Sequence, residues 1–235
     1  MKSVDTSLHG FLFPTISQDG WKFVSIMAVF TLIAAMIWFP LGCISFILTV
    51  WCFYSFRDPV RVTPVLSTAV VAPADGYIVS ITHEKGPDAV GLQNKNFTKI
   101  CIYNTPFDAH YCRSPIRSRI AKTFYDAGKP FTKSFDKNNL GNEKYIVALK
   151  QSENFDFVVQ QIATFCNKRI LNNFKLGDEF TAGQRLGFLR FGGYVEIFLP
   201  DKVQPIVCVG QKVVAGETII ANINSDAPRM EGEIR

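Results

Sequence analysis

The sequence predicts a mainly β (α+β) protein that begins with a helical hairpin. Two observations lead to this prediction. Residues 21–56 are almost entirely apolar, and the rest of the chain is made of short runs rich in valine and isoleucine, separated by turn residues. Such runs are typical of strands in a mainly antiparallel fold. We therefore expect an N-terminal segment at 1–20, a membrane-anchoring helical hairpin at 21–56 and a β-rich domain at 57–235.

The hairpin is predicted from the length of the apolar segment, which has no charged residue from Phe23 to Phe56. One membrane span needs about 20 residues, so the segment is too long for one straight helix and short for two full ones. A turn at Pro40-Leu41-Gly42 resolves this conflict. A buried core hairpin and a signal peptide are the alternatives. The run is too long for a signal peptide, and no small-residue cleavage site follows it.

Basic residues flank the apolar segment: Lys22 precedes it, and Arg57 and Arg61 follow it. By the positive-inside tendency, both ends of the hairpin are expected in the cytoplasm. The predicted location is therefore the cytoplasmic face of the inner membrane. We expect the two arginines to be snorkelling anchor residues rather than ligands.

The overall composition disfavours several other classes of protein. The formal charge of +5 comes without a block of Lys and Arg, which argues against a nucleic-acid partner and fits attraction to anionic headgroups. The six cysteines are scattered and form no CxxC pair, so neither a disulfide framework nor a structural metal site is expected. A reducing, cytosol-facing compartment is the simpler assumption.

In the second part of the chain, the apolar runs identify the expected strands and one helix. The helix is predicted at Val159–Asn172, where apolar residues recur at helical spacing. Turns are expected at 73–76 and 191–193. The expected strands are Ala69–Ala72, Tyr77–Ile81, Lys99–Tyr103, Phe155–Gln160, Tyr194–Leu199 and Ile206–Val209.

Residues 177–186 and residues 210–219 form an internal repeat. The two segments share the pattern G-x-x-(F/V)-x-A-G-(Q/E)-x-(L/I) without gaps. Paired glycines around an alternating apolar pattern suggest two similar hairpins, with Gly183 and Gly216 at positive φ. Such hairpins look like those of the barrel-sandwich hybrid fold of biotinyl and lipoyl carriers. No Met-Lys-Met tip is present, so a carrier is disfavoured, while a membrane adaptor on that fold stays open.

Three short motifs, the first of them in two parts, carry the chemistry. Phe56-Arg-Asp-Pro59 is followed by Val71-Ala-Pro-Ala-Asp-Gly76, then by Phe107-Asp-Ala-His-Tyr-Cys-Arg-Ser-Pro115 and by Arg190-Phe-Gly-Gly-Tyr-Val-Glu196. Their order and spacing behind an N-terminal anchor resemble the short bacterial form of phosphatidylserine decarboxylase. The resemblance covers nearly the whole chain. It implies an enzyme that converts phosphatidylserine to phosphatidylethanolamine and CO2 through a self-generated pyruvoyl group, as a homodimer and without a metal.

The resemblance also implies roles for individual residues. Asp75 matches the family's aspartate that supports self-cleavage, and His110 matches its histidine, a proton donor and acceptor near neutral pH. Arg113 is expected to bind the phosphate or carboxylate of the lipid. Each residue also has a simpler interpretation. Asp75 lies in a common type of turn, a lone histidine is more often structural, and Arg113 could pair with a surface acid.

The chain departs from the family at the position of the serine that becomes the pyruvoyl group. Gly193 occupies that position, and Gly192 precedes it as the glycine whose carbonyl is attacked. Glycine has no hydroxyl, so the pyruvoyl group cannot form at Gly193 by the family's chemistry. A tight turn, a sequencing error and an engineered change are alternative explanations of this glycine. Three functions therefore stay open: a decarboxylase-family protein, a catalytically inactive relative that binds phospholipid or regulates a partner at the membrane, and a membrane adaptor of barrel-sandwich type.

Overall fold

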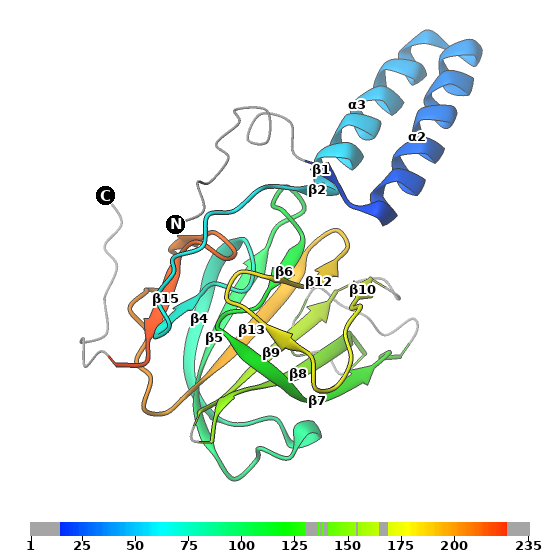
Figure 1. The fold of residues 1–235 in the computed structure, drawn as a ribbon. Coiled ribbons are helices and arrows are strands. Elements are labelled where there is room, and N and C mark those ends of the chain that lie inside the picture. Colours follow the sequence, from blue (N-terminus) through cyan, green and yellow to red (C-terminus); the bar gives the residue numbers. More distant parts are fainter. Residues whose placement is uncertain are drawn as a thin grey trace. The chain divides into compact units, whose positions relative to one another are not determined.

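The computed structural model describes residues 15–129, 136, 138, 141–153, 155–164 and 169–224. The chain forms two compact units. The first contains the residues up to Val60 together with Phe107–His110, and the second contains Arg61–Pro106 and the chain from Tyr111 onward. The first unit is helical and the second is built of strands (Figure 1). Helices followed by a β-rich part are the fold class that the sequence predicts.

The first unit contains the expected helical hairpin, made of α2 (Gln18–Ile37) and α3 (Phe39–Ser55). The predicted place of the turn was wrong. The chain leaves the helical conformation at Trp38, with φ −158° and ψ 118°, and Pro40 lies inside the first turn of α3. Proline is tolerated there because the first N–H groups of a helix have no partner within the helix. One extended residue is therefore enough to reverse the chain.

The two helices pack closely through small and hydroxyl-bearing side chains. A Cβ added at Gly42 would lie 2.6 Å from the Cβ of Ala35, so only glycine permits this approach. Thr31 and Thr49 share a 2.9 Å hydrogen bond between their side chains across the hairpin. Most large apolar side chains of the hairpin are exposed. Among the described residues, α2 alone is long and apolar enough to cross a membrane, with a mean hydropathy of 1.9 over Gly20–Ile37.

Most strands of the second unit form one curled eight-stranded antiparallel sheet (Figure 1). In pairing order they are β11 (Glu179–Phe180), β7 (Ser118–Asp126), β8 (Glu143–Ser152), β9 (Phe155–Ala163), β13 (Gly193–Pro200), β5 (Asn96–Asn104), β4 (Gly76–Lys85) and β14 (Lys212–Val213). Two smaller sheets are β10 (Ile170–Leu171), β12 (Arg185–Leu189) and β6 (Tyr111–Arg113), and β15 (Ile219–Asn222) with β3 (Ala69–Val71). A short 3-10 helix, η1 (Asp88–Val90), follows β4. In the first unit, β1 (Thr15–Ile16) pairs with β2 (Arg57–Asp58).

The main core of the second unit brings together side chains from all three sheets. Ile100 and Ile197 come from the large sheet, Leu189 comes from the three-stranded sheet and Val70 from the two-stranded one. Each of these four side chains is at most 1 % exposed. Burial of apolar surface of this kind is the dominant stabilising contribution in a β-rich domain.

The internal repeat is present in the structure, as two equivalent sets of hydrogen bonds. Gly177 and Asp178 exchange backbone hydrogen bonds with Ile120, and Gly210 and Gln211 exchange them with Ile78. The turn glycines Gly183 and Gly216 have φ of 76° and 75°, as predicted.

The strands of each repeat do not pair with each other. They join different sheets: β11 and β14 lie at the two edges of the large sheet, while β12 and β15 belong to the small sheets. The repeats are therefore bends between sheets rather than two-stranded hairpins.

Two predicted elements were wrong. Val159–Asn172 is not a helix, because β9 continues to Ala163 and β10 follows at Ile170, with residues 165–168 outside the described part. The strand β9 is buried on both faces, and its apolar residues therefore do not alternate with exposed ones in the way that marks a half-buried strand. Ile206–Val209 is not a strand, and only Pro205 makes an isolated bridge, to Ala221. Proline has no N–H to continue a ladder.

Candidate functional site

Asp75 lies in the turn between β3 and β4 and is 6 % exposed. Its Oδ1 accepts a 2.7 Å hydrogen bond from the Ala215 backbone N–H, and its Oδ2 accepts a 2.5 Å hydrogen bond from Nη2 of Arg61. Arg61 is thus an ion-pair partner of Asp75, not the snorkelling residue that the sequence suggested. The carboxylate is held at both oxygens, which is more than an ordinary turn aspartate requires.

Asn104, at the end of β5, connects Asp75 to the glycine pair. Its Nδ2 donates a 2.8 Å hydrogen bond to the Asp75 carbonyl oxygen, and its backbone is the register partner of Gly193 in β13. A Cβ added at Gly192 would collide with the Asn104 carbonyl oxygen. The structure therefore gathers Asp75, Gly192 and Gly193 around one buried asparagine. The sequence analysis missed Asn104 because nothing in its local pattern separates it from an ordinary strand end.

The turn that carries the glycine pair has an unusual backbone. Phe191, Gly192 and Gly193 have φ of 60°, 74° and 151°, and Phe191 is the only non-glycine residue with positive φ in the described part of the chain. A Cβ added at Gly193 would collide with the Ile162 carbonyl oxygen of β9. The turn predicted at 191–193 is therefore present, in a conformation that side chains rarely adopt.

Arg169 donates hydrogen bonds to this turn. The sequence analysis did not identify this residue either. Its guanidinium donates to the carbonyl oxygens of Arg190 at 2.7 Å and Gly192 at 2.8 Å, and also to that of Thr164. The Arg169 backbone N–H donates a 2.9 Å hydrogen bond to Glu143, which is fully buried. Nothing in the local sequence around Arg169 marks it as a partner of this turn.

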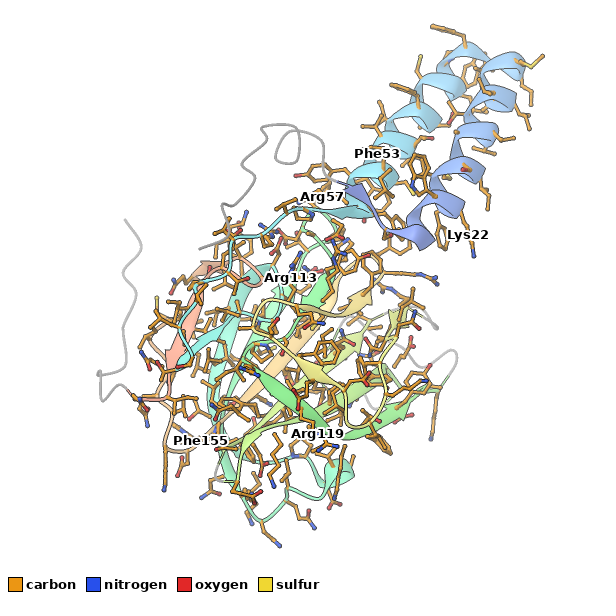
Figure 2. All side chains as sticks on the ribbon, in the orientation of Figure 1. Lys22, Phe53, Arg57, Arg113, Arg119 and Phe155 are labelled. Carbon is orange, nitrogen blue, oxygen red and sulfur yellow. The ribbon has the colours of Figure 1, made fainter. Side chains whose placement is uncertain are left out.

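His110 belongs to the first unit and is 2 % exposed. Its Nε2 lies 2.9 Å from the hydroxyl of Ser55, the last residue of α3. In the same unit, Arg57 donates from Nη1 to the Phe107 carbonyl oxygen at 3.0 Å and stacks on Tyr54, with its Cζ 3.7 Å from the ring centroid. The base of the helical hairpin therefore fixes the segment that carries the histidine. Figure 2 shows Lys22 and Arg57 at this same end of the hairpin.

Arg113 lies on β6 and is 8 % exposed. Its Nη1 donates a 2.9 Å hydrogen bond to the Gly183 carbonyl oxygen, and its Cδ would lie 3.1 Å from a Cβ added at Gly216. The side chain thus touches the turn glycines of both repeats. These contacts give Arg113 a structural task, whatever else it binds.

Next to Arg113, Cys112 is buried in the core of the second unit. Burial raises the pKa of the Cys112 thiol to about 12, against the opposing effect of hydrogen bonds with the Gln161 side chain and the Arg113 backbone. Burial also raises the pKa of the Tyr125 phenol, and its 3.0 Å hydrogen bond to Glu143 acts in the same direction. Both groups therefore stay protonated at neutral pH, which leaves Cys112 without the thiolate that nucleophilic chemistry needs.

Comparison with known proteins places these residues in a family. The family model described as phosphatidylserine decarboxylase matches residues 48–221, which include Asp75, His110 and the glycine pair. The chain belongs to the phosphatidylserine decarboxylase family. The protein named phosphatidylserine decarboxylase proenzyme in Cereibacter sphaeroides is 38% identical over 218 residues, 93% of this chain and 94% of the relative. The proenzyme of Ruegeria pomeroyi is 39% identical over 223 residues, 95% of this chain and 100% of the relative.

Phosphatidylserine decarboxylase proenzymes use a pyruvoyl group made from their own chain, and Gly193, which the resemblance predicts at the position of its serine, does not fit that group. Gly193 supplies no hydroxyl and no β-carbon. Its backbone also leaves no room for a β-carbon in this conformation, because the Ile162 carbonyl oxygen occupies the space. Among the described residues, no group of three or more His, Cys, Asp or Glu side chains is arranged to hold a metal ion. We derive no reaction step through the pyruvoyl group.

Proposed function

We propose that this protein is a phosphatidylserine decarboxylase-family protein that binds phospholipid at a membrane and stays a single uncleaved chain. Gly193 carries this proposal, because it stands at the position that the family resemblance gives to the self-processing serine. The curated relatives are named proenzymes of phosphatidylserine decarboxylase, so phosphatidylserine is the lipid we propose. Without a hydroxyl at residue 193, the chain does not decarboxylate this lipid unaided.

We propose that the first unit anchors the protein and that the surface it meets is the cytoplasmic face of the inner membrane. The exposed apolar side chains of α2 and α3 and the basic residues Lys22 and Arg57 at one end of the hairpin support this. His110, fixed by Ser55 at the end of α3, belongs to the same unit as the anchor. We include the homodimer that the resemblance implies, and light scattering of the purified protein measures it.

We propose that Asp75 and Arg113 of the second unit, and His110 of the first unit, each keep the role of their family counterpart. Asp75 is the carboxylate next to the glycine pair, and two hydrogen bonds hold it in place. We propose Arg113 as the contact to the phosphate or carboxylate of the lipid, since a guanidinium suits both groups. His110 is the proposed proton donor and acceptor. The part of the site that is lost is then the hydroxyl at residue 193 alone.

The first test is the intact mass of the protein, purified from membranes. We expect one chain of 26.4 kDa. We also expect binding to vesicles that contain phosphatidylserine to exceed binding to phosphatidylcholine vesicles, with no labelled CO2 released. Cleavage between Gly192 and Gly193, or decarboxylation by the unaltered protein, would contradict the proposal. Binding that does not depend on phosphatidylserine would contradict the choice of lipid.

The second test restores the missing hydroxyl through Gly193→Ser, with Gly193→Ala as the matched control. Both variants add a β-carbon against the Ile162 carbonyl oxygen at a positive φ, so they share the same strain. They differ only in the hydroxyl. We expect slow cleavage in the serine variant and none in the alanine variant, measured by intact mass. A folded serine variant that never cleaves would show that more than the hydroxyl has been lost.

A further inference from the structure

Arg169 directs its cationic side chain at backbone carbonyl groups. The residue is 8 % exposed. The three nitrogens of its guanidinium donate to three different carbonyl oxygens, of which two, those of Arg190 and Gly192, belong to the turn with the glycine pair. The Cζ of Arg169 also lies 5.9 Å from the centroid of the Phe191 ring in the same turn. One N–H group of this guanidinium therefore donates a hydrogen bond to the carbonyl oxygen of Gly192.

Neighbouring groups hold Arg169 in place before any reaction. Its backbone N–H donates to Oε2 of Glu143, and Oε1 of Glu143 accepts a 3.0 Å hydrogen bond from the Tyr125 hydroxyl. Its backbone carbonyl accepts a 3.0 Å hydrogen bond from the Arg190 backbone N–H. Both the main chain and the side chain of Arg169 are thus fixed relative to the turn. A donor fixed in this way stabilises a developing negative charge without having to reorganise.

We infer that Arg169 is the group that polarises the Gly192 carbonyl and stabilises the negative charge on its oxygen when a side chain at residue 193 attacks it. The inference rests on the proposed function, which makes Gly192–Gly193 the bond that the family cleaves. In the attack, the hydroxyl oxygen of residue 193 bonds to the Gly192 carbon, and the carbonyl electron pair moves onto the oxygen held by Arg169. When that pair returns, the bond to the Gly193 nitrogen breaks. The hydroxyl proton passes through a general base to this nitrogen, and an ester remains.

In the present chain residue 193 has no hydroxyl to begin this reaction, so no negative charge develops on the Gly192 carbonyl oxygen. The hydrogen bond from Nη2 of Arg169 to the Gly192 oxygen is nevertheless formed, at 2.8 Å. Polarisation of the carbonyl is therefore measurable in the unaltered protein. The role in cleavage is measurable in the Gly193→Ser background.

The first experiment observes the carbonyl directly in the full chain, in detergent micelles. Gly192–Gly193 is the only Gly-Gly pair in the sequence, so protein labelled with carbonyl-13C, 15N glycine gives one carbon-nitrogen correlation. We expect Arg169→Met to shift the Gly192 carbonyl carbon upfield, and Arg169→Lys to shift it less. Far-UV circular dichroism reports whether each variant folds. If the methionine variant unfolds, the lysine variant decides.

The matched control is Arg119→Lys. Arg119 is an exposed arginine of the same unit, and its Nε donates a 3.1 Å hydrogen bond to the carbonyl oxygen of a different glycine, Gly177. Its substitution should leave the Gly192 resonance where it was. An unchanged Gly192 resonance in folded Arg169 variants, or an equal shift in the Arg119 variant, would overturn the inference.

The second experiment compares Gly193→Ser with Gly193→Ser/Arg169→Met, which lacks the donor. Loss of one donor to an oxyanion lowers a rate by about 10²- to 10³-fold, so we expect cleavage slower by about that factor in the double variant. Equal cleavage rates would overturn the inference. If Gly193→Ser is folded and never cleaves while the carbonyl shift is observed, the claim that only the hydroxyl is missing fails, and the assignment of Arg169 to the Gly192 carbonyl is supported.

Discussion

At the scale of single residues, Asp75 shows how tightly the site is held. Its two carboxylate oxygens accept hydrogen bonds from Arg61 and from the Ala215 backbone. The side chain therefore connects the first residue of the second unit to the repeat at residues 210–219. Arg61 and Asp75 are both shielded, with side-chain exposures of 14% and 9%. Removing one partner of an ion pair that is largely shielded from water destabilises a protein more than removing one partner of a solvated pair.

We predict that Asp75→Asn lowers the free energy of unfolding by about 1–3 kcal/mol, because Arg61 loses its charged acceptor. Denaturant unfolding in detergent, followed by circular dichroism, measures this change. The matched control is Asp156→Asn, whose ion pair with Lys95 has the same 2.5 Å separation but a lysine that is 54% exposed. We expect the control to change stability by less than about 1 kcal/mol. Equal losses in the two variants would contradict the structural role assigned to Asp75.

A second prediction concerns pH and the buried thiol of Cys112. The folded chain keeps this proton up to a pKa of about 12, whereas the unfolded chain loses it near the ordinary value of 9.0. Between these values the folded state binds more protons, so its stability falls as pH rises. We expect unfolding free energies to fall less steeply from pH 9 to 12 in Cys112→Ala than in the unaltered protein. Identical slopes for the two proteins would refute the prediction.

At the scale of elements, the two repeats pair with two similar segments, residues 72–78 and residues 114–120, which we call the first and second frame. Only the first frame carries a residue of the candidate site, Asp75. Residues 72–78 pair with β14, and residues 114–120 pair with β11. The turn glycines of the two repeats donate matching backbone hydrogen bonds to the first residue of each range. Asp75 occupies the same place in the first frame as Arg117 in the second. Asp75 is buried and hydrogen-bonded, whereas Arg117 is exposed. The frame therefore provides stability in both halves, and the side chain at this one position distinguishes them.

The helical hairpin gives a prediction at the same scale. Gly42→Leu should separate α2 from α3, because the new side chain would overlap with Ala35. Overpacking of this kind costs about 1–3 kcal/mol. Thermal melting of the helical signal in micelles measures the loss. The neighbouring variant Cys43→Leu, at an exposed position of the same helix, should melt like the unaltered protein. If the two variants melt together, the close contact at Gly42 does not hold the hairpin.

At the scale of the whole molecule, the length of the hairpin predicts how deeply it enters a bilayer. The 20 residues of α2 extend about 30 Å, which equals the thickness of the hydrocarbon core. Trp38, at the tip, should then reach the far interface while Trp21 stays at the near one. Single-tryptophan variants in sealed vesicles with lipids brominated at stated depths report each position. Quenching of Trp38 by an aqueous quencher on the near side alone would show that the hairpin does not cross.

By itself, the sequence determined the family, the helical hairpin and most long strands. These follow from local signals: motif residues a few positions apart, an uninterrupted apolar segment, and Val- and Ile-rich runs such as those of β5 and β13. The strand β7 escaped prediction because most of its side chains are exposed, so no continuous apolar run marks it.

Only the tertiary structure decided which residues surround the glycine pair. Asn104, Arg169 and Glu143 are far from Gly193 or from one another along the chain, and each has an unremarkable local sequence. The order of the strands in the sheet places Asn104 beside Gly193, and a buried guanidinium brings Arg169 to the Gly192 carbonyl. Contacts of this kind depend on pairing and burial between distant segments. The sequence therefore predicted that Gly193 stands in place of the processing serine, and the fold showed which groups surround Gly193.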